Sequence, residues 1–445
     1  MEKNLTEGSV FKNIIVFSLP FLMSYLLQTL YGLADLFIIG KFDPTSSTTA
    51  VSIGSQVMHM VTVMIVGLAT GSTVLIGKAV GSGDRELKNR AIGNTILLFL
   101  AVAFVTTIIL LICVNPIVHV MSTPSEAVEG TRKYLIICFA GVPFITMYNI
   151  ICGIFRGMGD SKSPMYFVAV ACVCNIALDY IFIGGMGLGP AGAALGTTLS
   201  QALSVIIAVT VTIRKNMISG ISKEHFAFRS DIISNILKVG IPISAQDGFI
   251  QISFIVITIF ANRRGLADSA AVGIVEKLIG ILFLIPSTLL SSISAICAQN
   301  IGAGKNDRAR QTMWDGVMIA AGCGLVFAIL FQFIAEGVVG MFSSDPEVIR
   351  LGAQYMRSYV WDCVLAGIHF VFSGYFSACS RSGISFLHNM LSILLARIPI
   401  AYYTSVNYPD TLYPMGWAAP IGSLVSVIVC LIAYIWMKRK DEGEG

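Results

Sequence analysis

The chain has 445 residues, of which 55% are hydrophobic and 12% are charged, and its formal net charge is +4. The charged fraction is about half that of an average soluble domain, which excludes an ordinary water-soluble protein. The small positive charge does not suggest nucleic acid binding. Ten cysteines lie almost all within apolar segments, so they indicate no disulfide framework.

Six apolar segments follow one another in the first half of the chain. Each is about 20 residues long, enough to cross a hydrocarbon core of roughly 30 Å. They cover residues 14–40, 50–77, 91–114, 134–155, 165–185 and 191–213. The longest polar stretch of the chain, 214–231, follows them. We therefore expect a six-helix lobe over 1–213 and a cytoplasmic linker over 214–231.

The second half contains six more apolar segments and forms the expected second lobe, 232–445. They cover residues 233–261, 270–298, 313–335, 351–376, 385–406 and 413–436. Lysines and arginines concentrate in one set of loops, which places both termini in the cytoplasm. The sequence thus predicts a multi-pass protein of the plasma or inner cell membrane, surrounded by the lipid bilayer.

The two halves are copies of one another. Residues 50–54 read Ala-Val-Ser-Ile-Gly, and 221 positions later residues 271–275 read Ala-Val-Gly-Ile-Val. Duplicated sets of membrane helices are typical of transporters. We predict an all-α polytopic membrane protein, with twelve transmembrane helices in two pseudo-symmetric six-helix lobes and a central cavity.

Two carboxylates lie inside the apolar segments of the first half. Spacings of three and four residues place Gln28, Tyr31 and Asp35 on one helical face. A spacing of four gives Asn175 and Asp179 a second polar face. Carboxylates within a membrane helix are functional by default. The structural alternative is that each aspartate only bonds a neighbouring amide or tyrosine.

The rise of about 1.5 Å per residue lets the depth of these side chains be compared. It places Asp35, Asn175, Asp179 and Thr197 in the outer half of the same six-helix bundle. Four hard oxygen donors at one depth suit either a proton or Na⁺. We therefore predict a cation-coupling site formed by these four residues.

The duplication indicates which half holds the ion. At the equivalent positions, Ile400 stands for Asp179, and Ile257 stands for Asp35 with one residue of slip. Carboxylates that served only the scaffold would be expected in both copies. We therefore place the coupling site in the first half.

The apolar segments of the second half carry other charges, Asp247, Glu276, Lys277, Asp362 and Arg397. Arg397 could pair with Asp362 or with Asp247, and an arginine–aspartate pair satisfies itself. A structural role is thus favoured for these residues. Whichever of Asp247 and Asp362 is left over could line the cavity and contact a cationic substrate.

Pro20 and Pro242 occupy matching positions in the two halves. A proline within a helix frees a carbonyl group and permits a bend. Since Pro20 precedes Asp35 in the same segment, we expect it to act as a hinge that couples ion binding to cavity shape. A static kink for packing is the alternative.

Several motifs resemble those of the multidrug and toxic compound extrusion (MATE) family over essentially the whole chain. They begin with Pro20 and the Gln28-Tyr31-Asp35 face, followed by Gly-x-Gly-Asp-Arg at 81–85 and Arg-Gly-Met-Gly-Asp at 156–160. The most specific are Asn-x-x-x-Asp-Tyr-Ile-Phe at 175–182 and Gly-Pro-Ala-Gly at 189–192, leading to Thr197. The resemblance implies two six-helix lobes, a cavity between them, and export driven by inward proton or Na⁺ flow.

Carried over by the resemblance, Asp35, Asn175, Asp179 and Thr197 form the cation site, with Gln28, Tyr31 and Asn149 beside it. One branch of the family has acids in spans 7 and 10, whereas Asp247 and Asp362 lie about one turn from the expected positions. The first-half site is therefore the better match.

We expect a monomeric transporter, not an enzyme, that exports small amphipathic and cationic organic compounds, including drugs. It would need no cofactor besides H⁺ or Na⁺ as coupling ion. The nearest rival is a flippase for lipid-linked oligosaccharides, whose basic cavity would conflict with five intramembrane acids. An intramembrane enzyme would need an Asp-rich, His-Glu or Ser-Lys motif, and the sequence has none.

Overall fold

The computed structural model describes residues 4–215 and 220–443. Residues 216–219 of the expected linker lie outside the described residues, as do 1–3 and 444–445 at the ends of the expected lobes. The described residues form helices and connecting turns, without a strand. Ten helices are long and apolar enough to cross a membrane, and two bent helix pairs bring the number to twelve. The prediction of an all-α protein with twelve spans is confirmed.

The described chain divides into two compact units. Unit 1 comprises Val16–Gly240 with the N-terminal residues up to Leu5, and unit 2 comprises Thr6–Ile15 with the chain from Ile241 onward. The division thus falls beside Pro242, inside a helix, whereas the sequence suggested the polar linker. The linker belongs with unit 1 because its residues pack on that unit, as His225 and Ala227 do through hydrogen bonds from Asn94.

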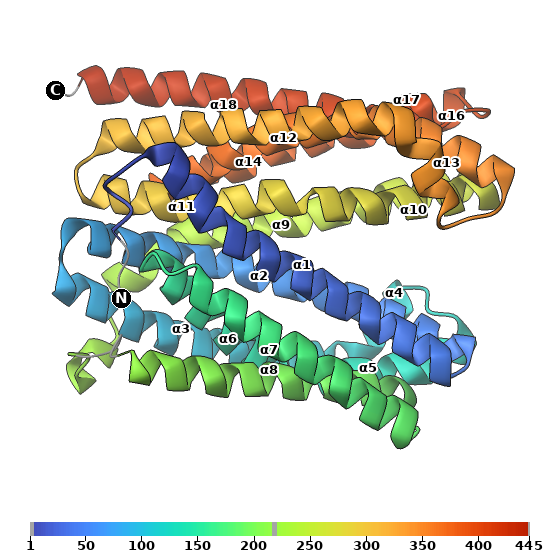
Figure 1. Cartoon of the computed structure of the whole chain (residues 1–445), viewed down its shortest axis with the longest axis horizontal. Coiled ribbons are helices and arrows are strands. Elements are labelled where there is room, and N and C mark those ends of the chain that lie inside the picture. Colours follow the sequence, from blue (N-terminus) through green and yellow to red (C-terminus); the bar gives the residue numbers. More distant parts are fainter. Residues whose placement is uncertain (1–3, 216–219, 444–445) are drawn as a thin grey trace. The chain divides into compact units, whose positions relative to one another are not determined.

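Eleven elements belong wholly or mainly to unit 1. They are α1 (Val10–Phe42), α2 (Thr45–Ser82), α3 (Arg85–Ile112), α4 (Val114–Val120), η1 (Ser125–Ala127), α5 (Val128–Ala140), α6 (Val142–Gly157), α7 (Lys162–Asp179), η2 (Tyr180–Gly185), α8 (Gly189–Arg214) and η3 (Lys223–Phe226). Within the unit, α2 packs on α5 and α6, and α7 lies beside α8 (Figure 1).

Small residues bring α6 and α2 into close contact. The Thr73 hydroxyl donates a hydrogen bond to the Gly153 carbonyl at 3.0 Å. A Cβ added to Gly157 would lie 2.8 Å from the Thr73 carbonyl oxygen. Small residues at such crossings let two membrane helices approach closely and gain packing energy. This contact fixes the position of α6, which carries several of the polar residues discussed below.

Unit 2 contains the remaining elements. They are α9 (Ser230–Arg264, from Ile241), α10 (Leu266–Leu282), α11 (Leu284–Gly302), α12 (Asn306–Gly340), α13 (Pro346–Tyr359), α14 (Asp362–Ala378), α15 (Ser382–Ser392), η4 (Ile393–Arg397), α16 (Ile398–Asn407), α17 (Tyr413–Gly416) and α18 (Ala418–Gly443). Within this unit α12, α14 and α18 lie side by side (Figure 1).

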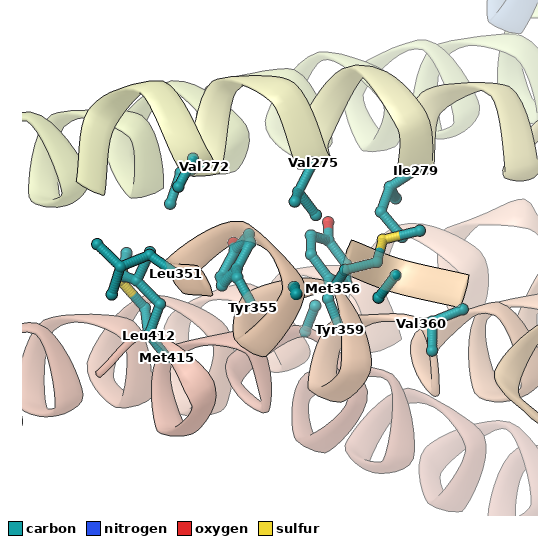
Figure 2. Close-up of a cluster of buried hydrophobic side chains, with 14 of the residues drawn as sticks. Val272, Val275, Ile279, Leu351, Tyr355, Met356, Tyr359, Val360, Leu412 and Met415 are labelled. Atoms are coloured by element: carbon teal, nitrogen blue, oxygen red, sulfur yellow. The ribbon is translucent and has the colours of Figure 1, made fainter. Parts of the chain in front are cut away.

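The core of unit 2 is built largely between α10, α13 and α17. Figure 2 shows Val272, Val275 and Ile279 of α10 facing Tyr355 and Tyr359 of α13. The two tyrosine rings meet edge to face at 5.4 Å. Burial of such large side chains stabilises a fold by roughly 1.5–3 kcal/mol each relative to exposure in water.

One span of each unit is bent at an equivalent place. Ser125–Ala140 and Val142–Gly157 meet at 48° in unit 1, and Pro346–Tyr359 and Asp362–Ala378 meet at 40° in unit 2. The breaks fall at Gly141 and just before Asp362, which are 221 positions apart. The apolar pattern continues through both breaks, so the sequence indicated the spans and not the bends.

Candidate functional site

Four polar side chains meet between α1, α7 and α8 of unit 1. Asp35 comes from α1, Asn175 and Asp179 come from α7, and Thr197 comes from α8. The Thr197 hydroxyl donates a hydrogen bond to Asp35 Oδ2 at 3.3 Å. The carboxyl groups of Asp35 and Asp179 are close enough to interact, and Asn175 lies beside Asp35. The fold therefore brings together the four residues that the sequence placed at one depth.

This cluster is buried and poorly satisfied. Asp179 is 0% exposed, Asn175 1% and Asp35 5%. Both oxygens of Asp179, Oδ1 of Asp35 and both amide atoms of Asn175 have no hydrogen-bond partner among the described residues. Two adjacent carboxylates repel each other in a low dielectric. Such a group becomes favourable when a proton or a cation neutralises it.

The donor set is suited to a hard monovalent ion or a proton. The described residues contain no group of three or more His, Cys, Asp or Glu arranged to hold a metal. The cluster instead combines two carboxylates with the amide of Asn175 and the hydroxyl of Thr197. Oxygen donors of this kind are typical ligands for hard cations.

Gly196 makes room for the Asp179 carboxylate. A Cβ added at Gly196 would lie 2.2 Å from Asp179 Oδ1, so α8 can approach this acid only with glycine at that position. The α-helical part of this span ends at Asp179, and the π-helical turn η2 follows at once. Insertions of this kind in membrane and soluble helices occur frequently at functional sites.

Tyr31 extends the cluster along α1. Its hydroxyl contacts the Gln201 side chain, and its ring lies near the Asp35 carboxyl. Sequence reasoning did not select Gln201, whose Oε1 has no partner among the described residues. Gln201 follows Thr197 by four residues on α8, so helical spacing could have placed it on the same polar face.

Gln28 and Asn149 line a different cavity of unit 1. Its walls come from α1, α2, α6 and α7 and include neither Asp35 nor Asp179. Arg156, which sequence reasoning assigned only to a motif, lines the same cavity. The expected neighbours of the cation site therefore separate into Tyr31, which adjoins it, and Gln28 with Asn149, which do not share its cavity.

The acids of unit 2 are arranged differently. Asp362 is 1% exposed, and its Oδ2 lies 4.0 Å from Arg397 Nη2, which also donates to the Tyr359 hydroxyl at 2.8 Å. Of the two partners considered for Arg397, the structure thus selects Asp362. Glu276 accepts a hydrogen bond from Thr258 at 3.0 Å. Asp247 is half-buried and forms no ion pair with a described residue.

Unit 2 has no counterpart of the polar cluster. Positions 221 residues after Asn175, Asp179 and Thr197 hold Ala396, Ile400 and Ala418, and Ile257 stands 222 residues after Asp35. Ile257 and Ala418 belong to the buried core of unit 2, and Ile400 packs against it. The same helical framework therefore carries polar groups in one unit and apolar packing in the other.

Comparison with known sequences identifies a duplicated family domain. The MatE family model matches residues 20–181 and again 242–403. The Bacillus subtilis protein YoeA, named a probable multidrug resistance protein, is 25% identical over 447 residues, covering 98% of this chain and 96% of the relative. MepA of Staphylococcus haemolyticus, named a multidrug export protein, is 24% identical over 378 residues, covering 84% and 83%.

Solved structures share the fold over nearly the whole chain. A MATE protein in a straight conformation superposes with a TM-score of 0.90 at 21% identity, covering 99% of this chain and 98% of its own. The same comparison with a MATE protein in a bent conformation gives 0.88 at 22% identity, covering 99% and 97%. The Vibrio cholerae MATE transporter VcmN gives 0.89 at 18% identity, covering 97% of each chain.

Proposed function

This chain belongs to the MatE family, and we propose that it is a secondary transporter that exports amphipathic, often cationic organic compounds in exchange for H⁺ or Na⁺. The family relation makes it a membrane transporter and not an enzyme. The relatives in Bacillus subtilis and Staphylococcus haemolyticus are named for multidrug resistance and multidrug export. These names support drugs as substrates and do not favour a flippase for lipid-linked oligosaccharides.

The observation that carries the coupling proposal is the unsatisfied acid pair of unit 1. Asp35 and Asp179 are buried and close together, and three of their four carboxylate oxygens lack a hydrogen-bond partner. We assign the coupling ion to these two residues, with Asn175 and Thr197 as further oxygen donors. The ionised pair favours the substrate-bound state, and an arriving proton or Na⁺ neutralises the pair and favours release.

Bending of α1 is the proposed link between ion binding and substrate release. The helix runs without interruption through Pro20 and carries Asp35 further along. The Ser24 hydroxyl donates to the Pro20 carbonyl at 2.9 Å, which supports the backbone near the proline. MATE structures are known in straight and bent conformations. In this proposal Pro20 is the hinge, and alternating access follows from the bend.

The remaining polar residues have secondary roles in this proposal. Tyr31 adjusts the field at Asp35, while Gln28 and Asn149 belong to a substrate-facing wall of unit 1. Asp247, which has no ion pair with a described residue, contacts the positive group of a substrate. Asp362 is held by Arg397 and serves mainly to satisfy that cation. We propose a monomer with both termini in the cytoplasm.

Transport in proteoliposomes with separately imposed gradients tests this function. A pH gradient or a Na⁺ gradient, each applied with the other absent, should drive movement of the cationic dye ethidium against its own gradient. Collapse of the active gradient should stop it. Dye movement at the same rate without either gradient would refute coupling. Movement of a lipid-linked oligosaccharide without dye transport would favour the flippase.

A further inference from the structure

Arg156 is a buried cation that lacks an acidic partner. It lies in the last turn of α6 and is 7% exposed. Its Nη2 has no hydrogen-bond partner, and the side chain forms no ion pair with any described residue. An uncompensated charge in a low dielectric costs several kcal/mol, and charged groups at such depth are functional by default. A group that supplies negative charge would therefore be strongly favoured beside it.

The acid that follows in the same motif is committed elsewhere. Asp160 accepts hydrogen bonds from Ser163 Oγ at 2.6 Å and from Lys215 Nζ at 3.0 Å. Burial alone would raise the pKa of Asp160, but these hydrogen bonds outweigh burial and hold its pKa below the usual value. Asp160 is thus an ionised carboxylate that serves Lys215 and leaves Arg156 unpaired.

Arg156 lines an enclosed cavity without any acidic residue. The walls include Phe21, Tyr25 and Gln28 of α1, Tyr148 of α6 and Pro164 at the start of α7. The cavity volume is about 30 Å³, room for one or two water-sized groups. Only a small anionic group fits, so a larger ligand would place its charged end here.

Two side chains can donate hydrogen bonds into this cavity. The hydroxyl of Ser24 and the amide nitrogen of Asn149 are already used by backbone carbonyls of their own helices. Gln28 makes no hydrogen bond with a described residue, which leaves its amide hydrogens available beside those of Arg156. The Phe21 ring faces the guanidinium at 6.0 Å. That distance is the outer limit of a cation–π contact and satisfies none of the N–H groups.

We propose that this cavity, lined by Arg156 and Gln28, is an anion-binding site that accepts the carboxylate of an aromatic organic acid. The guanidinium fork matches a carboxylate with two parallel hydrogen bonds, and the Gln28 amide can donate a third. Aromatic walls suit a flat apolar body attached to the carboxylate. A phosphate group carries more charge and more acceptors than these two residues can satisfy.

Titration calorimetry of the full chain in detergent, with benzoate as the probe, tests this site. The protein should bind one benzoate, and Arg156→Gln should weaken the affinity by about 10- to 100-fold because a charge-assisted pair is lost. Arg156→Lys should remain weakened, since an ammonium group cannot bind bidentately. The matched control Arg350→Gln removes the same charge from an exposed helix where Glu347 is its partner, and it should leave benzoate binding unchanged.

A second variant and a stability readout keep the proposal testable if Arg156→Gln folds poorly. Gln28→Leu removes no hydrogen bond to a described residue, so it should fold and bind benzoate several-fold more weakly. Benzoate should raise the Tm of the unmodified protein and raise that of either variant less. Unchanged benzoate affinity in both variants would overturn the site.

Phosphate arms separate the chemical class from its sources. Inorganic phosphate and phosphatidylglycerol vesicles should show no binding that depends on Arg156. If either binds through Arg156 while benzoate does not, the carboxylate assignment is wrong. The assay needs no ion gradient, so its failure would leave the coupled-export proposal intact, and failure of coupling would leave this site intact.

Discussion

At the scale of single residues, Gly196 controls the position of the Asp179 carboxylate. In Gly196→Ala the new Cβ would lie 2.2 Å from Oδ1, so the carboxylate must move away from Asp35. Because misplacement by about 1 Å can cost roughly 100-fold, we expect gradient-driven dye transport to fall by about 10- to 100-fold. Transport rates in proteoliposomes check this.

Gly280→Ala is the matched control for that change. Nothing lies within 4 Å of the Cβ it would add on α10, so transport should be unchanged. Equal transport by the Gly196→Ala and Gly280→Ala proteins would show that Asp179 does not depend on the close approach of α8.

Asp362 and Asp247 should differ in their effect on stability. Asp362 is fully buried and lies 4.0 Å from Arg397, and removing one partner of a buried pair costs about 3–5 kcal/mol. We expect Asp362→Asn to lower the Tm in detergent clearly and Asp247→Asn to leave it nearly unchanged. Similar Tm values for the two variants would contradict a structural role for Asp362.

Helical spacing identified polar faces but not their surroundings. It grouped Gln28, Tyr31 and Asp35 correctly on α1, yet Gln28 lines a cavity that does not include Asp35. Spacing along one helix carries no information about which neighbouring helix each side chain meets. For the same reason Arg156 drew no attention, because a basic residue in the last turn of a helix is expected from the helix dipole alone.

At the scale of elements, the linker is docked on α3 by one buried side chain. The Asn94 amide nitrogen donates to the carbonyls of His225 and Ala227, and its oxygen accepts from the Arg229 backbone nitrogen at 2.9 Å. Each such bond contributes about 1 kcal/mol. Asn94→Ala should therefore free η3 and speed trypsin cleavage at Lys223, measured by the rate at which the chain is cut.

Glu86→Gln provides the comparison, since Glu86 contacts the same linker from an exposed position. His225 and then Arg90 hold the pKa of Glu86 below its usual value. Its contribution is therefore present at neutral pH and lost only as the pH falls through that lowered pKa. Cleavage of Glu86→Gln at pH 7 should rise less than that of Asn94→Ala. The reverse order would contradict docking through Asn94.

The apolar pattern predicted the existence of every span but not the bends within them. Residues 134–155 and 351–376 are continuously apolar, while the helices break at Gly141 and just before Asp362. A break between two helices that both remain in an apolar environment leaves hydropathy unchanged. The division of the chain beside Pro242 also depended on contacts that the sequence does not state.

At the scale of the whole molecule, the duplicated scaffold persists while its chemistry diverges. Thr73 and Gly153 hold α2 on α6, and Ser294 and Gly374 occupy the equivalent positions 221 residues later in α11 and α14. Both pairs are small residues at a close helix crossing. By contrast, the polar cluster of unit 1 is replaced by Ile257, Ile400 and two alanines. One copy is therefore free to bind an ion while the other is committed to packing.

The central claim is that the coupling ion binds at Asp179 and Asp35 in unit 1, and gradient-driven dye export by Asp179→Asn tests it most directly. We predict that this variant still binds ethidium but that neither a pH nor a Na⁺ gradient accelerates its export. Glu276→Gln, which changes an acid of unit 2 held by Thr258, should keep the gradient dependence. Gradient-driven export by Asp179→Asn at the unmodified rate would contradict the account.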